Sequence, residues 1–286
     1  GLDNSGIEAE RAHLTTQMKA NGFESIQEFE QYISDYEKAF EQSAVRLAED
    51  HLLRYRHLLY EEEKKLNDDA YLDQLLQEVQ SSGAKGHYEA ADQHSQNARN
   101  LSSPDDHISD PYASMKADER SKASTERRAG ESAIEGSVSS FLVQEDQFDR
   151  EDLAYAESKA QLKEQMQEYI EEKYESINET WADLHENSEY IYKLDKLFAA
   201  NVQAQGFEEG SIFESIINDK AERIADAEWF KTITIIVLAI ALTIVTLGAA
   251  TPLAIAAGVA SVGLSLYSVY EAADTYQKNN AANDVG

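Results

Sequence analysis

Apolar side chains recur every three or four residues along most of the chain, which is the spacing of one face of an α-helix. The first such stretch follows Ser25 and Glu28, whose separation is that of a capping box at a helix start. Its apolar stripe comprises Ile26, Phe29, Ile33, Tyr36, Phe40, Ala44 and Leu47 and continues to about Leu66. The pattern predicts one long helix here, followed by a shorter helix that Asp68 and Asp69 cap and that runs through Val79.

A second long stretch of helical spacing lies in the C-terminal half. We expect one helix over about 149–200, with Gly206 after its end, because its apolar positions alternate spacings of four and three. Its seam comprises Ile177, Trp181, Leu184, Ile191 and Phe198, and it is interrupted by Ser188 and Asp195. Gly210 and Ser211 are expected to start a further helix, whose apolar positions are Ile212, Ile216, Ile217 and Ile224.

The stretch 81–148 has a different composition. Ser, Gly, Asp and Asn are common there, and it contains Pro104 and Pro111, two of the three prolines of the chain. Because proline opens helices and turns, the stretch predicts short helices and loops inserted between longer helices. Basic residues outnumber acidic ones between Lys116 and Arg128. We expect these cations to form a solvated helix face that bridges to the acidic body; the alternative is a docking site for an acidic partner.

The sequence contains no charged residue between Lys231 and Glu271. Gly248 and Pro252 divide this segment, as a turn between two helices requires. The helices expected at about 232–247 and 253–270 would each be about 25 Å long, near the lower limit for crossing a hydrocarbon layer. The first is apolar all round, and the second has small residues at every fourth position, which allow another helix to approach closely.

This segment predicts a hydrophobic helical hairpin that engages a membrane, with aromatic side chains and a lysine at one interface. The expected membrane-hairpin residues are Trp229, Lys231, Ile236, Ile240, Leu242, Ile244, Gly248, Pro252, Gly258, Ser261, Leu264, Tyr267 and Tyr270. Two alternatives stay open: the hairpin is the buried centre of a soluble helical bundle, or it is an ordinary membrane anchor.

Taken together, the patterns predict an all-α fold, an elongated bundle of long amphipathic helices with a C-terminal hydrophobic helical hairpin. We divide it into an N-terminal long-helix region (1–80), short helices and loops (81–148), a second long-helix region (149–228), and the hairpin with a polar tail (229–286). The few glycines and prolines argue against an all-β chain.

Charge and composition narrow the function. With 25 basic and 54 acidic side chains, the net charge of −29 argues against nucleic-acid binding, which needs clustered Lys and Arg. The absence of cysteine excludes disulfides, thiolate catalysis and cysteine metal sites. The first residues do not read as a signal peptide, and since the sequence starts with Gly1 we expect a processed product or an excised piece.

The sequence contains no Gly-rich phosphate-binding loop, no nucleophile elbow and no dinucleotide-binding fingerprint, so it carries none of these enzyme signatures. No two histidines have the i, i+4 spacing of helical zinc ligands, and Glu10 with His13 is a single Glu-x-x-His pair where a di-iron bundle needs two. We expect His87 and His94 to be solvated surface histidines, and runs such as 61–63 to be exposed helix faces. We therefore expect no enzymatic activity, no catalytic or metal-binding residue and no cofactor.

Two sets of motifs carry a family resemblance. The first set is Gly-Phe-Glu-Ser at 22–25, Phe-Glu-Gln-Ser-Ala at 40–44 and the stretch 53–63; the second is 210–213, 220–224, the uncharged segment and 267–276. Together they resemble the central region of large bacterial polymorphic toxins associated with extracellular contractile injection systems. In that family a zinc-protease-like domain with His-Glu-x-x-His often precedes this region. Here His185 and Glu186 are followed by Glu189 in place of the second histidine, so protease activity is not carried over.

The resemblance implies a secreted or injected effector region, soluble before it meets a membrane. Its expected function is non-enzymatic: the hairpin assists membrane engagement, pore formation or delivery of a toxin domain. Its implied partners are a membrane, under some conditions, and injection-system components or adjacent toxin domains of the same polypeptide. The alternative is a structural spacer or packaging segment of an injection-system effector, in which the hairpin stays permanently buried.

Overall fold

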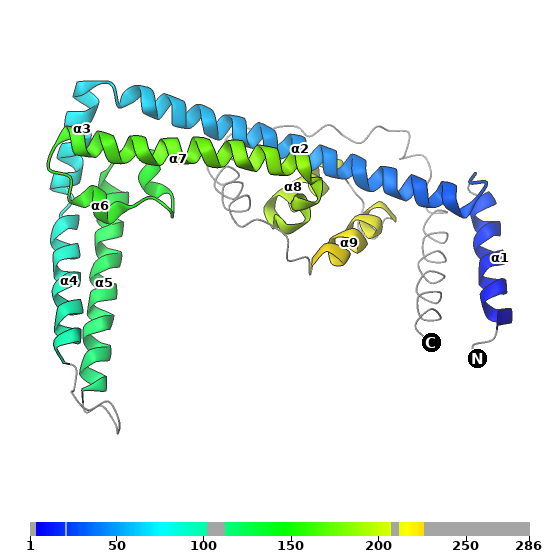
Figure 1. Ribbon diagram of the computed structural model, residues 1–286, viewed down its shortest axis with the longest axis horizontal. Helices are drawn as coiled ribbons and strands as arrows, with labels where there is room; N and C mark the ends of the chain where they lie inside the picture. The colour runs from blue at the N-terminus through cyan, green and yellow to red at the C-terminus, as the bar shows by residue number, and fades with distance from the viewer. Residues whose placement is uncertain (1–3, 21, 102–111, 207–211, 226–286) are drawn as a thin grey trace. The chain divides into compact units, whose positions relative to one another are not determined.

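The computed structural model describes residues 4–20, 22–101, 112–206 and 212–225 (Figure 1). All regular structure in these ranges is helical, without a β-strand, which confirms the all-α class. The α-helices are α1 (Asn4–Ala20), α2 (Ile26–Lys65), α3 (Asp69–Ser81), α4 (Ala84–Asn100), α5 (Ala113–Ser137), α6 (Arg150–Ala154), α7 (Lys159–Glu186), α8 (Asp195–Gln205) and α9 (Ile212–Ala225). Two 3-10 helices, η1 (Phe141–Gln144) and η2 (Ser188–Lys193), lie between them.

The chain forms two compact units. The first unit contains Gly1–Tyr55 and Ser176–Gly286, and the second unit contains Arg56–Glu175. The long helices α2 and α7 each contribute residues to both units. Units of this kind arise when the chain leaves one core, completes another and returns, so sequence order alone does not define them.

Ser25 caps the start of α2 as the sequence predicts, and Glu28 reaches back to the N–H of Glu24, one residue before the cap. The Glu28 N–H donates to Ser25 Oγ over 3.1 Å, and the Glu28 carboxylate accepts from the Glu24 N–H over 2.6 Å. Two backbone donors that have no partner inside the helix are thereby satisfied. The predicted cap of α3 is confirmed as well, since Asp68 Oδ1 accepts from the Ala70 N–H over 2.9 Å.

An aromatic and polar core holds the first unit together. The Phe40 ring of α2 stacks on Tyr192, with ring centroids 6.3 Å apart, and meets Phe198 edge-on at 5.7 Å. Beside them Asn201 is fully buried; its amide donates to the Phe40 carbonyl over 3.1 Å and its oxygen accepts from Ser43 Oγ over 3.0 Å. Because a buried amide without partners is costly, these bonds specify how α8 is oriented on α2.

The single helix expected over 149–200 is wrong. The structure breaks it into α6, α7, η2 and α8. At the breaks, polar side chains bond to nearby backbone N–H groups: Ser158 Oγ accepts from Gln161 over 3.3 Å, and Asn187 Oδ1 accepts from Glu189 over 3.0 Å. Such local bonds compete with helix continuation. The expected stop at Gly206 is confirmed, because this residue ends α8 in the left-handed conformation with φ of 66°.

The prediction of only short helices and loops at 81–148 is also corrected by the structure. This stretch contains α4, of 17 residues, and α5, of 25 residues, which run side by side as an antiparallel pair, the α4–α5 hairpin (Figure 1). The buried positions of the two helices are mostly alanine, which favours a helix, whereas the prediction of loops came from the Ser, Gly, Asp and Asn content. The buried residues of α4 and α5 are Ala84, Tyr88, Ala91, Ala98, Ala123, Gly130 and Ile134.

Gly130 lets the two helices approach closely. A Cβ placed on it would lie 2.9 Å from Cζ and 3.0 Å from Cε2 of the buried Tyr88 ring. Gly136, in the same helix, has nothing within 4 Å of such a Cβ. The two glycines are therefore a matched pair, one required by packing and one not.

We expect Gly130→Ala to destabilise the hairpin by about 1–3 kcal/mol, because the Tyr88 ring has to move in a packed interface. Gly136→Ala should leave the stability of the hairpin unchanged or raise it by up to about 1 kcal/mol. Alanine gives the unfolded chain fewer backbone conformations than glycine, so less entropy is lost on folding. Urea unfolding followed by circular dichroism, with hydrogen exchange of α4 and α5 peptides, measures both. Equal effects of the two substitutions would contradict the close approach at Gly130.

Candidate functional site

A cluster of charged side chains joins α9 to the rest of the first unit. We call Glu37, Glu41, Glu189, Lys220 and Arg223 the Lys220 cluster. Lys220 Nζ lies 2.7 Å from Glu189 Oε1, 3.7 Å from Glu37 Oε2 and 3.8 Å from Glu41 Oε1. Arg223 Nη2 lies 2.6 Å from Glu37 Oε1. Three carboxylates thus surround one ammonium group, and one of them also binds a guanidinium.

The local sequence explains how these groups meet. Glu37 and Glu41 lie one turn apart on α2, so both face the same neighbour, and Lys220 and Arg223 are likewise one turn apart on α9. Glu189 comes from η2, in the break that the sequence pattern did not predict. The apolar side of α9 packs through Ile216, Ile217 and Ile224, all of them buried. Helix α9 is therefore docked by an apolar face and by ion pairs together.

Burial and neighbouring charges act in opposite directions on the pKa values of Glu41 and Lys220. Glu41 is only 5% exposed, and its carboxylate accepts a hydrogen bond of 2.7 Å from Ser188 Oγ. Burial raises the pKa of Glu41, although the Ser188 hydrogen bond and the Lys220 charge oppose the rise. Burial alone lowers the pKa of Lys220, but its hydrogen bond to Glu189 and the charges of Glu41 and Glu37 outweigh that effect, so its pKa is raised.

The sequence carries a signal for the α2 side of this cluster. Glu37 and Glu41 directly follow Tyr36 and Phe40 in the sequence, so they lie beside the apolar stripe of α2. If the buried face of the helix is wider than the stripe, it includes both glutamates. Their partner α9 could not be assigned, because the stripe does not show which helix packs against it. Glu41 and Lys220 both lie within the motifs that carry the family resemblance.

The carboxylate runs expected to be exposed helix faces are partly buried. Glu62 is 1% exposed and accepts from the Tyr71 hydroxyl over 2.5 Å and from Lys65 over 3.2 Å. The neighbouring Glu63 accepts from the Tyr174 hydroxyl over 3.0 Å. The expectation is therefore wrong for Glu62, because tyrosine hydroxyls from other helices supply the donors that water would otherwise supply.

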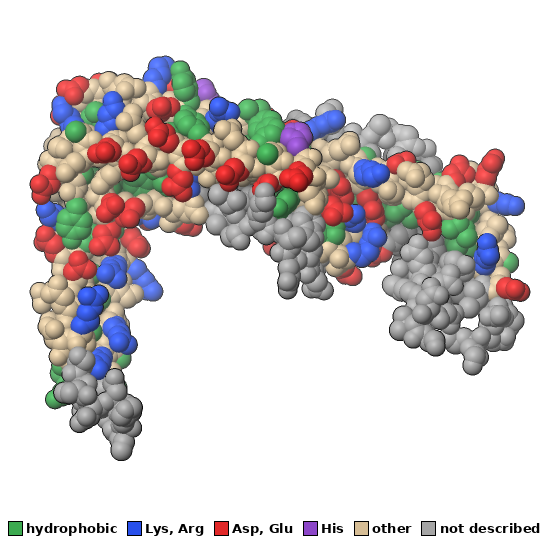
Figure 2. Space-filling model, in the orientation of Figure 1, with side chains coloured by type: hydrophobic (Ala, Val, Ile, Leu, Met, Phe, Trp, Pro, Cys, Tyr) green, Lys and Arg blue, Asp and Glu red, His purple; other side chains and the backbone are tan. Residues whose placement is uncertain are grey.

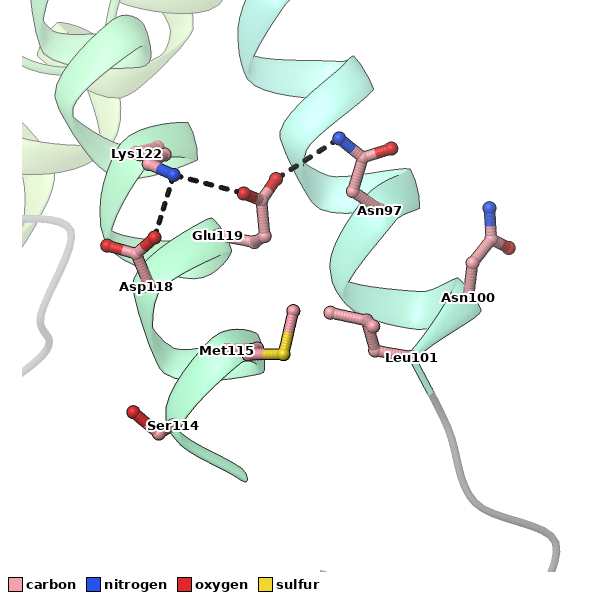
Figure 3. A pocket seen from close by; sticks show the side chains of 8 residues that line it. All are labelled: Asn97, Asn100, Leu101, Ser114, Met115, Asp118, Glu119 and Lys122. Atoms are coloured by element: carbon pink, nitrogen blue, oxygen red, sulfur yellow. Dashed lines mark hydrogen bonds and ion pairs between the residues drawn. The ribbon is translucent and has the colours of Figure 1, made fainter. Parts of the chain in front are cut away.

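A shallow pocket of about 700 Å³ lies between the ends of α4 and α5 (Figure 3). Met115 and Leu101 point toward each other across it, and Lys122 bonds to Asp118 and Glu119 on its α5 side. The lining residues are Asn97, Asn100, Leu101, Ser114, Met115, Asp118, Glu119 and Lys122. Within the lining, Glu119 accepts hydrogen bonds from Asn97 and from Lys122.

Two histidines tie α4 to α5. His87 Nδ1 lies 2.7 Å from Glu126 Oε2, and His94 Nδ1 lies 2.8 Å from Glu119 Oε2. They were predicted to be solvated surface histidines; both are partly exposed, and each contacts a glutamate. Hydrogen bonds from His94, from Asn97 and from Lys122 lower the pKa of Glu119 to about 2.

Lys and Arg side chains gather along the α4–α5 hairpin in Figure 2. Several of them pair with acidic residues of the same two helices: Lys122 lies 2.7 Å from Asp118, and Arg127 lies 3.3 Å from Asp92. The expected bridge from this stretch to the acidic body is replaced, for these two cations, by pairing inside the hairpin. A docking site for an acidic partner gains no support from these contacts.

The residues of the incomplete His-Glu-x-x-His motif contact partners on other helices. His185 Nε2 lies 2.6 Å from Glu49 Oε1, whereas Glu189 binds Lys220. In the part of the chain that the structure describes, no group of three or more His, Asp or Glu side chains is arranged to hold a metal ion. The His185 motif thus takes part in helix pairing rather than in a metal centre.

The predicted membrane-hairpin residues, from Trp229 to Tyr270, lie outside the described residues. Within the described ranges, no helix is both long and apolar enough to span a bilayer. Comparison with known proteins finds no matching family model, no similar curated protein and no similar solved structure.

We expect Glu119→Gln to reduce hydrogen-exchange protection of the α4–α5 hairpin at pH 7. A carboxylate whose folded pKa is lowered stabilises the fold above its unfolded pKa, and this contribution disappears as pH falls through about 2. The difference between parent and variant should therefore shrink as pH decreases from 5 toward 2. Glu131→Gln, at an exposed position of the same helix, is the control. A difference that stayed constant with pH would contradict the assigned role of Glu119.

Proposed function

We propose that this protein is a non-enzymatic helical region that presents an uncharged segment to a membrane. The observation that supports the proposal most is the absence of charge between Lys231 and Glu271, a few residues after a helix that is docked by partly buried ion pairs. A segment of this length and apolarity needs either a protein core or lipid to cover it. The docked helix α9 provides the base from which it would extend.

In the proposed mechanism, the segment forms a C-terminal hydrophobic helical hairpin that inserts from the side carrying Trp229, Lys231 and Tyr270. Aromatic rings and a lysine suit the interface between headgroups and hydrocarbon. The tip between Gly248 and Pro252 carries no charge and would cross at low cost. Acidic residues flank the segment; they are Glu222, Asp226, Glu228, Glu271 and Asp274. Their ionised forms oppose contact with an anionic surface, so membrane engagement is expected to strengthen as pH falls.

The resemblance to polymorphic toxins extends this proposal to a biological setting. In that setting the chain is part of a secreted or injected bacterial effector, and the hairpin assists pore formation or delivery of an adjacent toxin domain. The competing proposal is a spacer inside an injection-system effector, with the uncharged segment permanently covered by protein. The two proposals differ in one measurable property, which is whether the protein acts on lipid bilayers.

We expect the chain to release dye from anionic liposomes, and more strongly at pH 4.5 than at pH 7.5. A Leu242→Asp, Leu264→Asp double variant should lose this activity, since each charge costs about 2.5–3.5 kcal/mol near the bilayer centre. The Leu242→Ala, Leu264→Ala variant is the matched control, because it shortens the same side chains without adding charge. Identical leakage by the parent and the aspartate variant at every pH would exclude the membrane function. Equal leakage by the parent at all pH values would remove only the acid dependence.

A fragment ending at Ala227 should be soluble and helical without detergent, because its apolar positions follow helix stripes and most of the net negative charge lies within it. Circular dichroism and size-exclusion chromatography test this expectation. A largely unfolded spectrum would mean that the uncharged segment completes the core of the body, which would favour the spacer.

A further inference from the structure

Opposite charges in the Lys220 cluster come from different elements. Both cations, Lys220 and Arg223, belong to α9, whereas the three carboxylates belong to α2 and η2. Helix α9 therefore carries both cations away from the carboxylates whenever it detaches. It leaves behind Glu37, Glu41 and Glu189, three acidic groups that lie close together and that the two cations neutralise in part only while α9 is docked.

The two shortest contacts of α9 require ionised carboxylates. Glu189 Oε1 lies 2.7 Å from Lys220 Nζ, and Glu37 Oε1 accepts a hydrogen bond of 2.6 Å from Arg223. A protonated carboxyl has no charge with which to hold a cation, so each contact weakens when its carboxylate binds a proton. Tyr192 of η2 lies beside these carboxylates, and burial raises its pKa, so its hydroxyl stays neutral in acid.

Glu41 responds to the cations of α9 in the same direction. Burial raises its pKa with α9 in place, and the charge of Lys220 opposes that rise. The hydrogen bond that Glu41 accepts from Ser188 joins α2 to η2 and does not involve α9. When α9 detaches, Glu41 keeps this bond but loses Lys220, while the other carboxylates of the cluster remain near it. It therefore binds a proton more readily in the detached state than in the docked state.

We propose that the Lys220 cluster is an acid-opened clasp: ionised carboxylates of α2 and η2 hold α9 at neutral pH, and their protonation makes α9 detach more readily in mild acid. The sign follows from linkage. Because the detached state binds protons more readily, docking weakens as pH falls toward the range in which glutamates titrate, near pH ~4. The apolar contacts of Ile216, Ile217 and Ile224 do not depend on pH, so acid lowers the free energy of opening and leaves this part of the docking in place.

The clasp deepens the proposed function, and its use rests on that function. In mild acid α9 would detach more often while the acidic residues that flank the uncharged segment lose their charge. The tether of the segment would then be longer by α9, whose 14 residues span about 21 Å as a helix. One change of pH would thus act both on the segment and on its point of attachment.

Hydrogen exchange of α9 peptides in the full chain, without lipid, tests the clasp. After correction for the pH dependence of intrinsic exchange, protection of α9 should fall about threefold or more between pH 7 and pH 4.5. Peptides of α8 should change less, because α8 is held on α2 by the uncharged Asn201. Glu222→Gln removes an exposed carboxylate from α9 itself and should show the same fall as the parent. Constant or rising protection of α9, or an equal fall in α8, would overturn the clasp.

A variant without the two cations separates the clasp from other effects of acid. The double variant Lys220→Met, Arg223→Met should be less protected at α9 than the parent at pH 7. It should also lack the fall toward pH 4.5, because its α9 has no cation that needs an ionised partner. A fall as large as that of the parent would contradict the clasp.

Sodium chloride provides a second measurement on the parent, which keeps the test decisive if the double variant fails to fold. Raising the concentration from about 0.05 M to about 0.5 M screens partly exposed ion pairs, so protection of α9 should decrease at pH 7 and change less at pH 4.5. Insensitivity to salt at pH 7 would count against the clasp. Because no lipid is present, the clasp can fail while liposome leakage succeeds, and the reverse.

Discussion

The removal of charged side chains from water is the constraint on which both units depend. A buried carboxylate or ammonium group costs several kcal/mol unless donors and acceptors are placed around it. This chain nevertheless buries Glu37, Glu41, Glu62, Glu145, Arg150 and Lys173. Each bonds to at least one group outside its own helix or connection, as Glu41 does to Ser188 and Glu62 to Tyr71, so the segments that supply those partners must be docked before the charges are tolerated.

The second unit shows how such groups organise irregular backbone. The connection between α5 and α6 has few regular hydrogen bonds of its own, and the Arg150 guanidinium donates to the carbonyls of Val143 and Glu145 over 2.7 and 3.1 Å. From α7, the Tyr169 hydroxyl donates to the Glu145 carboxylate over 2.5 Å, and Lys173 Nζ donates to Gln147 over 2.5 Å. Burial lowers the pKa of Lys173. The connection is thus held by side chains of its neighbours.

Helix caps and stops could be predicted from the sequence, whereas the contacts between side chains of different helices could not. The cap at Ser25, the cap at Asp68 and the stop at Gly206 each depend on residues within one turn, and all three were predicted. The breaks around α7 were missed because an apolar seam continues across them, although Asn187 and Ser158 are typical capping residues. The buried glutamates were missed because their donors lie on other helices, as Tyr71 and Lys220 do. Nothing in a single helix stripe identifies such partners.

The small residues between α4 and α5 have a consequence for how the molecule opens. Alanine and glycine bury little apolar area, so the hydrophobic contribution per turn is lower there than around Phe40 or Leu59. The hairpin should accordingly behave as a separate cooperative unit, with the smallest free energy of opening among the helices of its unit. Under native conditions this pair of helices would exchange, and become accessible to proteases, while the rest of the unit remains closed.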